Sequence, residues 1–542
     1  MQQDVILKRA LESGSVDDLK AVSALWGPGF NTRRIDPQIA RTLVDRGATL
    51  TVHAAAGLGL TDHLGRMLDE DSSLIDAKGG DACTPLHFAR DVATAELLLA
   101  RGARVDARDE DHESTPAQWL IGDAPEVVRF LLDRGAAPDI FIAAALGDRD
   151  LASRLIDANP ACVSSRIGRL PDFPPLGHNK RGGTIYQWTL AFNSYPHQIA
   201  LRKGHPDLFE LLWARTDDTT RLLVACVLAR RADAEAIVAR HPGIVASLPP
   251  ADLELLPRYC WETNTNYDAV KLMLDLGFPI AHPETSHGYT ALHNAAWSGS
   301  GDLVDLLIAR GAPVDLVDPG YHATPLGFAL HDCLVEKRHP EGEFGRVVKS
   351  LIEAGSPWDA LDYPTGDSRL DEVFMEYLPH RIDGAALLGD EDLVSRLLGE
   401  HPSPDQFAMA LGGAAKGGHA TLCAALLARG ADVNGTSGAD RATPLMHAVR
   451  GSSAPGSLAT IELLLREGAD AGRANRYATL PLHAAAWVGA DVDTVRVLLR
   501  AGTPAHIEAK NEFGFTPARI AAEKGRDEIA ALFREFSSRS AS

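Results

Sequence analysis

The sequence has little positive charge and few aromatic side chains. Its 542 residues carry 53 Lys and Arg against 73 Asp and Glu, which gives a formal net charge of −20. Proteins that bind nucleic acid without sequence preference rely on Lys and Arg contacts with phosphates, and proteins that dock on anionic membranes rely on basic clusters. The charge balance argues against both classes. Aromatic residues make up only 6% of the chain, so an aromatic side chain outside a core position is a candidate for a binding surface.

Paired cysteines and long apolar runs are also missing. The six cysteines lie far apart and none forms a CxxC pair, which is typical of buried thiols in a reducing compartment and not of a disulfide frame or zinc site. We therefore expect no metal and no cofactor. The apolar run at residues 222–229 is much shorter than the ~20 residues that a membrane helix needs. Residues 1–20 lack the pattern of a secretory signal, so we expect a cytoplasmic protein.

A short motif recurs along the chain. Thr84-Pro85-Leu86-His87 returns as Thr290-Ala291-Leu292-His293 and as Leu480-Pro481-Leu482-His483. Looser copies begin at Thr115, Thr324, Thr443 and Thr516, and neighbouring copies start 31 to 37 residues apart. A second segment with the ending Gly-Ala, such as residues 303–312, lies between successive starts. This regular spacing indicates a repeat architecture, which replaces the three or four separate domains that ~150 residues per domain would suggest.

Each repeat is interpreted as a pair of short helices. A Thr can cap the first helix through its hydroxyl group, and a Pro fits the first helical turn, where its missing N–H is not needed. Leu303, Leu306 and Leu307 give the second helix a buried stripe, and Gly311 suits the left-handed backbone that ends a helix. Because so short a pair cannot bury its apolar face alone, neighbouring pairs must stack.

The motif, the ~33-residue period and the Gly-Ala ending together resemble the ankyrin repeat. The resemblance implies an all-α ankyrin-repeat solenoid of about fourteen helix-pair units with short β-hairpin tips, the tip being matched most closely at residues 511–516. Its composition is acidic, and the 42 Arg against 11 Lys are typical of a GC-rich bacterial genome.

Interruptions of the period divide the array. The predicted organisation is an N-terminal sub-array at 1–159, an insertion at 160–194, a central sub-array at 195–356, an aromatic insertion at 357–379 and a C-terminal sub-array at 380–542. Loops of this length in a compact fold are usually functional or disordered. Their aromatic content argues against disorder, and they could also simply cover the surface of the solenoid.

Candidate binding residues follow from the resemblance, which implies a variable, solvent-facing side chain seven positions after the motif start. Trp297 and Trp487 occupy that position, and His331 occupies it in the repeat that begins at Thr324. A Trp on such a surface suggests an anchor for a partner, although it could instead pack sideways on the adjacent repeat. Trp119 is a weaker candidate, because it lies only four residues after Thr115 and is expected to be half-buried.

The acidic segment at residues 106–113 offers a second kind of site. Asp111, His112 and Glu113 place carboxylates and an imidazole close together, which could bind a metal or supply a general base. A solvated acidic turn explains the run more simply, because ankyrin hairpins favour Asp at the tip. The resemblance also implies that His87, His293 and His483 tie the tip to the helix, so they are assigned to the scaffold.

Two functions follow. The first is a non-enzymatic scaffold that binds a protein partner of basic or mixed surface on its concave face. The alternative is a small-molecule or enzymatic site enclosed by the 160–194 insertion. Its lining would be Asp111, His112, Glu113, Gln118, Tyr186, Trp188 and His331, with His112, Glu113 and His331 as the catalytic candidates. The sequence lacks the phosphate-binding, dinucleotide, zinc-protease and serine-hydrolase motifs, so an enzyme is the less favoured reading.

Overall fold

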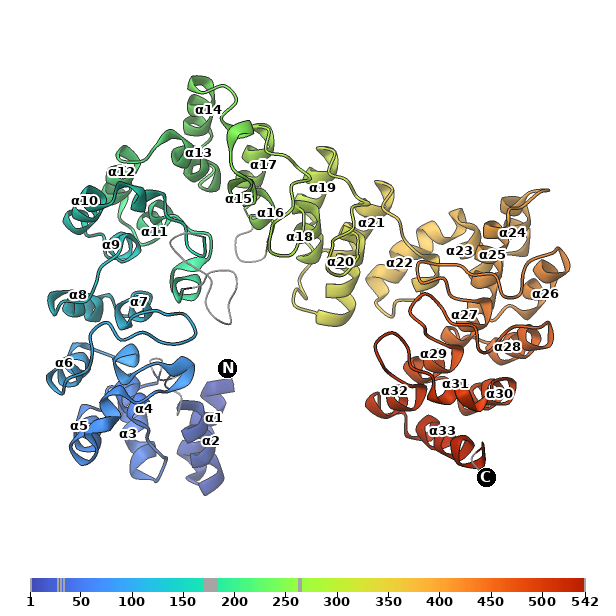
Figure 1. The fold of residues 1–542 in the computed structure, drawn as a ribbon, viewed down its shortest axis with the longest axis horizontal. Helices are drawn as coiled ribbons and strands as arrows, with labels where there is room; N and C mark the ends of the chain where they lie inside the picture. Colours follow the sequence, from blue (N-terminus) through green and yellow to red (C-terminus); the bar gives the residue numbers. More distant parts are fainter. Residues whose placement is uncertain are drawn as a thin grey trace. The chain divides into compact units, whose positions relative to one another are not determined.

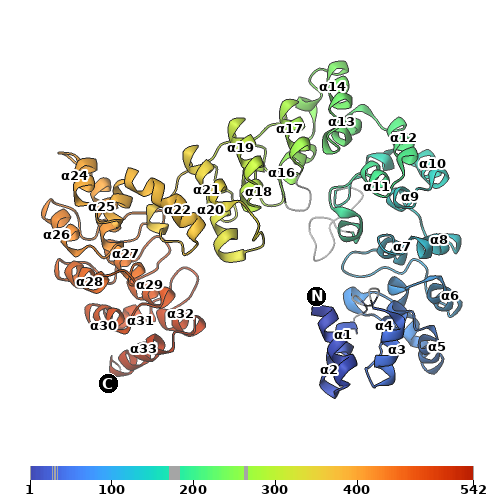
Figure 2. The same ribbon diagram turned by 180° about the vertical axis from the view of Figure 1, so that it is seen from behind.

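The computed structural model describes residues 2–26, 29, 32, 35–169, 184–261 and 266–540. The chain forms two compact units, residues 1–253 with 268–278 and residues 254–267 with 279–542. Each unit is a succession of short helix pairs (Figure 1 and Figure 2). Within the described ranges, no helix has both the length and the apolar character that crossing a membrane requires.

The helices of the first unit are mostly seven to twelve residues long. They are α1 (Gln2–Ser13), α2 (Val16–Trp26), α3 (Pro37–Asp45), α4 (Val52–Leu58), α5 (Thr61–Glu70), α6 (Val92–Ala100), α7 (Pro116–Leu120), α8 (Pro125–Asp133), α9 (Ile140–Leu146), α10 (Arg149–Ala158), α11 (Pro196–Arg202), α12 (Pro206–Ala214), α13 (Asp218–Val227), α14 (Arg231–Arg240), α15 (Pro250–Leu253) and, from its second residue on, α17 (Tyr267–Asp275). Single turns of 3-10 or π-helix add η1 (Ser72–Asp76), η2 (Gly80–Ala82), η3 (Pro85–Phe88), η4 (Pro160–Ser164), η5 (Gln187–Ala191) and η6 (Val245–Ser247).

The second unit repeats the same pairing. Its helices are α16 (Leu255–Arg258), α18 (Ala291–Trp297), α19 (Gly301–Ala309), α20 (Pro325–His331), α21 (Phe344–Glu353), α22 (Ser368–Tyr377), α23 (Ile382–Leu387), α24 (Glu391–Leu398), α25 (Pro404–Lys416), α26 (Ala420–Ala428), α27 (Pro444–Arg450), α28 (Ser457–Arg466), α29 (Pro481–Val488), α30 (Val492–Ala501), α31 (Pro504–Glu508), α32 (Pro517–Glu523) and α33 (Asp527–Ser540). The short turns are η7 (Asp332–Glu336), η8 (Ala360–Asp362) and η9 (Leu378–His380).

The helices begin where the sequence places their caps. The hydroxyl groups of Thr115, Thr443 and Thr516 accept hydrogen bonds from the backbone N–H three residues later, at 3.4, 3.3 and 3.2 Å. A proline follows each of these caps at the first helical position. The cap supplies a partner for an otherwise unpaired backbone N–H, and proline has no N–H to leave unpaired.

The core of each unit lies between two rows of helices. In the second unit the first helices of successive pairs, α25, α27, α29 and α32, form one row, and the second helices α26, α28, α30 and α33 form the other (Figure 1). Small side chains let the rows approach: Ala485 and Ala486 are fully buried. A Cβ on Gly413 of α25 would lie 2.1 Å from the backbone oxygen of Asp383, so only glycine fits there.

Buried histidines tie each first helix to the next turn. The ring Nδ1 of His483 accepts the backbone N–H of Leu480 at 3.1 Å, and its Nε2–H donates to the backbone oxygen of Phe515 at 3.1 Å. His87 makes the equivalent bonds at 3.0 and 3.2 Å, and burial lowers its pKa to about 4. These neutral imidazoles act as parts of the scaffold.

The prediction of β-hairpin tips is wrong. The described residues contain no β-strand and only an isolated bridge between Ser437 and Ala442. The reason is that side chains take the place of a strand ladder. At the tip that begins at Asp109, one backbone bond crosses the turn, from Asp109 N to Ser114 O, and the Asp109 carboxylate accepts the N–H groups of His112 and Ser114.

Successive tips are linked by single backbone hydrogen bonds. In the second unit, Arg476 N donates to Asp440 O at 3.0 Å, and Glu512 N donates to Tyr477 O at 3.1 Å. In the first unit, Glu110 N donates to Asp81 O at 3.1 Å. The tips therefore form a row beside the first helices, joined much more lightly than the helices themselves.

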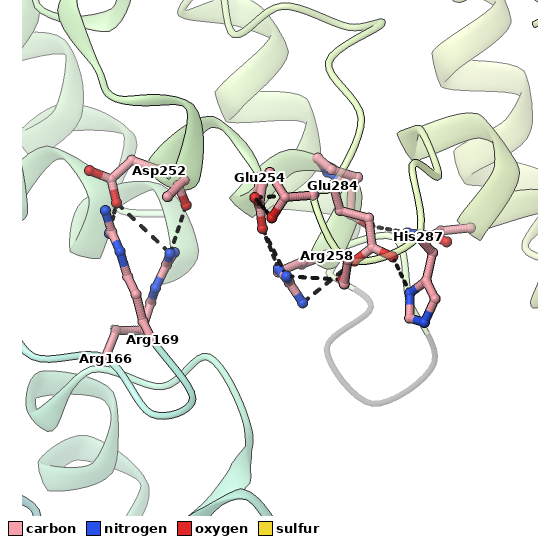
Figure 3. Close-up of polar contacts among 12 residues, drawn as sticks. Arg166, Arg169, Asp252, Glu254, Arg258, Glu284 and His287 are labelled. Atoms are coloured by element: carbon pink, nitrogen blue, oxygen red, sulfur yellow. Dashed lines mark hydrogen bonds and ion pairs between the residues drawn. The ribbon is translucent and has the colours of Figure 1, made fainter. Parts of the chain in front are cut away.

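Two buried charge networks lie near the boundary between the units, each within its own unit (Figure 3). In the first unit, Arg166 and Arg169 at the start of the insertion reach the Asp252 carboxylate of α15. In the second, Arg258 of α16 pairs with Glu254 at 2.8 Å and with Glu284 at 3.5 Å. Each network anchors an irregular segment to a helix of the same unit.

The two predicted insertions differ in how much of them the structure describes. Residues 170–183, which include most of the Pro-rich stretch and Gly182-Gly183, lie outside the described residues. The part that follows, Thr184 to Ala191, ends in η5. The aromatic insertion at 357–379 contains α22 and packs as an incomplete repeat, since Phe374 is buried 5.2 Å from the ring of Trp358.

Candidate functional site

A groove of about 840 Å³ runs along the second unit. Its base is formed by the first helices α25, α27, α29 and α32, and its wall by the tips at residues 439–440, 475–479 and 511–515. η8 of the aromatic insertion closes one end, since Asp359, Leu361 and Asp362 also line the groove. The groove therefore draws on four consecutive helix pairs and exists only because they stack.

Exposed aromatic side chains mark the open end of the groove. Trp487 of α29 is 59% exposed and Phe513 of the last tip is 64% exposed, and both line the groove. The ring of Tyr477 lies 6.4 Å from that of Phe513. Large apolar side chains are rarely left exposed in a cluster unless they meet a partner.

A charge network centred on Asp440 joins the first tip of the wall to the base of the groove. Its carboxylate pairs with Arg450 and accepts a hydrogen bond from Asn475 Nδ2 at 2.8 Å. Burial acts to raise the pKa of Asp440, but Arg450 and Asn475 outweigh it and lower the pKa. His447 lies beside them, where burial and the charge of Arg450 lower its pKa to about 3, so its ring is neutral.

Lys416 and Asp362 face the groove without an ion pair. The Lys416 ammonium donates to the backbone oxygen of Leu361, and desolvation together with the charge of Arg450 lowers its pKa to about 8. Asp362 is open to solvent on its groove side but otherwise surrounded by protein. Desolvation and the neighbouring Asp359 raise its pKa to about 6. Lys416 and Asp362 also attract each other, which opposes both shifts but does not cancel the effect of desolvation.

The two tryptophans at the same repeat position have different surroundings. Trp297 is half-buried between Trp261 and His331, whose rings stack on it at 6.4 and 5.7 Å. Trp487 has Lys524 over its face at 3.9 Å and remains mostly exposed. Trp297 therefore packs sideways on its neighbours, whereas Trp487 is available at the groove.

The acidic segment of the first unit forms a closed turn. Trp119 Nε1 donates to Asp109 at 2.9 Å, and the ring of His112 packs on the edge of Trp119. Burial acts to raise the pKa of Asp109, but these hydrogen bonds and those from the backbone lower it to about 2. Asp109 in turn raises the pKa of His112. Asp111 is half-buried and Glu113 is exposed at the end of the turn.

Tyr186 and Gln118 do meet, but inside the protein. The Tyr186 hydroxyl donates to Asp139 at 2.6 Å, and Gln118 Nε2 donates to the same carboxylate oxygen at 3.0 Å. Trp188, two residues further on, is 77% exposed. His331 belongs to the second unit, where it is exposed and lies 3.8 Å from Glu336. The enzymatic role of these residues stays a prediction.

One buried cluster has the composition of a metal site. Cys83, His87 and Asp109 bring their ligand atoms within 4.8 Å of one another. The His87 and Asp109 atoms are already engaged in hydrogen bonds, however, and the Cys83 thiol is held in its protonated form. His87 is bonded at both ring nitrogens, Asp109 accepts three N–H groups, and burial raises the pKa of Cys83 far above its ordinary value. The cluster is accounted for as the framework of a tip.

Three stretches of the chain match family models. Residues 81–110 match a model of a single ankyrin repeat, residues 262–308 a model of ankyrin repeats in many copies, and residues 383–475 a model of three ankyrin repeats. The chain is an ankyrin-repeat protein. Ankyrin repeats are protein-interaction modules. No curated protein matches this ankyrin-repeat chain as a whole or in part.

The family match places the first part of the groove on ankyrin repeats, because the match at 383–475 covers α25, α27 and the tip at 439–440. Sequence reasoning found Trp487 but missed Asp362, Lys416, Asp440 and Arg450. One sequence signal could have found Asp440. It lies three positions before each motif start, where the chain has Asp440, Tyr477 and Phe513. Side chains at this position project from consecutive tips and so form one column along the groove.

Proposed function

We propose that this ankyrin-repeat protein binds a segment of a partner protein in the groove of its second unit, with Trp487 as the central anchor. The observation that carries the proposal is the open groove of about 840 Å³ with two large exposed aromatic side chains at its edge. Its volume lies within the range of about 300–1,000 Å³ that ligand sites usually have.

The surroundings of Trp487 fit the role of an anchor. Residues that dominate binding energies are enriched in Trp, Tyr and Arg and are flanked by groups that exclude water. Trp487 is flanked by Val488 on its own helix, by Phe513 and Phe515 on the tip, and by Ile520 on the next helix, all of which line the groove. A partner side chain that enters there would be enclosed by apolar surface on several sides.

The proposal is tested by comparing two exposed tryptophans. Trp487→Ala removes the anchor, and Trp188→Ala removes a ring of the first unit that is exposed to an even greater extent. Tagged wild type and both variants are used to recover bound proteins from the cells that make the protein. We expect one or more partners that Trp188→Ala retains and Trp487→Ala loses.

The affinity for the purified partner gives the quantitative result. Loss of an anchor costs at least about 2 kcal/mol, which is roughly 30-fold in Kd. Recovery of the same partners by Trp487→Ala at wild-type levels would show that the groove is not the binding site. A loss confined to Trp188→Ala would move the site to the first unit.

A further inference from the structure

One lysine lies inside the groove, at the end that η8 closes. Lys416 is the last residue of α25, and its ammonium donates to the backbone oxygen of Leu361 in η8. Both residues line the groove, whose volume of about 840 Å³ admits a small molecule. Among the lysines that the structure describes, Lys416 and Lys349 are half-buried and the others are exposed.

Lys349 of α21 shows the usual state of a half-buried lysine. Its ammonium pairs with the Glu376 carboxylate at 2.8 Å, and this hydrogen bond raises the pKa of Lys349 above its ordinary value of 10.5. At pH 7.4 less than about one in a thousand of its side chains is therefore a neutral amine.

The surroundings of Lys416 have the opposite effect. Desolvation lowers its pKa to about 8, and the charge of Arg450 acts in the same direction, whereas Asp362 and Asp359 act against it. The other titratable ring beside it, that of His447, is neutral. Within the described part of the chain, Lys416 forms no ion pair. At pH 7.4 about a fifth of its side chains are thus neutral amines.

A neutral lysine at a cavity wall is a nucleophile. The ammonium form has no lone pair, and a lysine desolvated by its surroundings attacks carbonyl carbons at neutral pH. The carboxylates of Asp362 and Asp359 decide between the carbonyl compounds. Attack on an acyl donor gives an uncharged amide, which would leave both carboxylates without a facing cation. Attack on an aldehyde gives an iminium ion, which keeps the positive charge that they face.

We propose that Lys416 binds small aldehydes covalently, as an imine, at the closed end of the groove. The site combines an accessible amine, room for a small molecule and two carboxylates that stabilise a cationic product. This inference goes beyond the proposed function and does not depend on it, because the anchor Trp487 lies at the open end.

The reaction needs no further reactant. The lone pair of the Lys416 Nζ attacks the carbonyl carbon and forms a C–N bond, while the π electrons of the C=O bond move to the oxygen. A proton passes through solvent from the nitrogen to this oxygen. The resulting hydroxyl takes up a second proton and leaves as water, while the nitrogen lone pair forms the C=N bond. Loss of the remaining proton on nitrogen returns the one taken up, so amine and aldehyde give imine and water.

The test is reductive trapping on the full-length protein. Salicylaldehyde is added at pH 7.4 with sodium cyanoborohydride, which reduces an imine to a stable secondary amine, and peptide mapping by mass spectrometry follows each lysine. We expect Lys416 to be modified at least about 10-fold faster than Lys349, because far more of it is neutral. Its rate should level off above pH 8, while that of Lys349 keeps rising. In denaturant the two lysines should react alike.

The comparison lies within one folded protein, so it does not depend on whether a variant folds. Lys416→Gln should lose the fast modification, and Lys349→Gln should keep it. Equal rates for Lys416 and Lys349 in the folded protein, or a faster Lys416 that persists in denaturant, would overturn the inference and leave the proposed function standing. Trp487→Ala, which tests the proposed function, should leave the modification of Lys416 unchanged.

Discussion

The surface formed by the first helices is covered in the first unit and open in the second. In the first unit, the end of the insertion covers that surface: Ile185 N donates to Ser114 Oγ at 3.1 Å, and Tyr186 is buried with its hydroxyl on Asp139. In the second unit, none of the residues that the structure describes fills the groove, and Trp487 is 59% exposed. One unit therefore covers this surface with its own chain, and the other leaves it open.

The comparison teaches what decides whether an aromatic ring on this surface is buried or exposed. Tyr186 packs 5.5 Å from Phe141, and its hydroxyl finds a carboxylate inside the protein, so burial leaves no polar atom unpaired. Trp487 has the ammonium of Lys524 over its face at 3.9 Å and stays 59% exposed. The ring that completes its contacts within the chain belongs to the scaffold, and the one that does not is available for binding.

The largest expected effect is a loss of stability when the covered surface of the first unit is disturbed. Tyr186→Ala removes a buried ring and the hydroxyl that Asp139 accepts, and truncations of this kind cost about 3–5 kcal/mol. Amide hydrogen exchange of residues 114–146 in the full-length protein should show a matching loss of protection. Trp188→Ala, in the same turn but exposed, should change stability by less than about 0.5 kcal/mol.

Equal losses of stability in Tyr186→Ala and Trp188→Ala would contradict the distinction between a buried and an exposed ring. They would mean that the insertion stabilises the first unit by its presence alone and not by the seating of one ring.

For the open groove we expect a large effect on binding and a small effect on stability. Trp487→Ala should weaken partner binding by at least about 2 kcal/mol, because the anchor is lost, while the thermal unfolding of the protein stays nearly unchanged. Isothermal titration with the purified partner and a melting curve of the same sample give the two values. A strong drop in melting temperature would show that Trp487 is a scaffold residue like Tyr186.

A third prediction concerns acid and compares two tips. The buried carboxylate of Asp109 has a pKa of about 2 in the folded protein against 3.8 ordinarily, so its contribution is complete above pH 4 and is lost as the pH falls through 2. The stabilisation lost is about 2 kcal/mol. Asn511 holds the equivalent tip with an uncharged amide oxygen, which accepts the N–H groups of Phe513 and Phe515.

Hydrogen exchange between pH 5 and pH 2, corrected for the intrinsic rates, should show loosening at residues 109–115 and none at residues 511–515. Asp109→Asn should remove the difference between the tips. If both tips loosen in the same pH range, the titration of Asp109 is not the cause.

The smallest effect is expected from Tyr186→Phe, which keeps the ring and removes the hydroxyl. Asp139 retains Gln118 and the N–H groups of α9 as partners, so the loss should be about 1 kcal/mol, the usual value of one hydrogen bond. Denaturant unfolding, compared with Tyr186→Ala, separates the contribution of the hydroxyl from that of the ring.

Much of the fold could be predicted because its signals are local. The threonine caps, the prolines after them and the histidine three residues on all concern one helical turn, and each is found where the sequence places it. The β-hairpin tips could not be predicted correctly, because the outcome depends on competition between a strand ladder and side chains. The side chains of Asp109 and Asn511 accept N–H groups of the turn, so these groups do not pair with a second strand.

The candidate site was less accessible to sequence reasoning. Trp487 stood out by its repeat position, but the same position in Trp297 leads to a half-buried ring, since Trp261 and His331 flank it. Lys416 and Asp362 lie 54 residues apart in sequence and more than 100 residues from Lys524. Their meeting depends on how the repeats stack, which no short window of sequence contains.

The hydrogen bonds between tips determine how the groove can deform. The first two tips are joined by Arg476 N to Asp440 O together with bonds from the Asn475 and Arg476 side chains, whereas Glu512 N to Tyr477 O joins the last tip, and opening that single bond costs about 1 kcal/mol. The first helices at the base are held together far more tightly, as the close approach at Gly413 shows. The tips can thus spread while the base keeps its spacing, so that segments of different thickness fit the same row of helices.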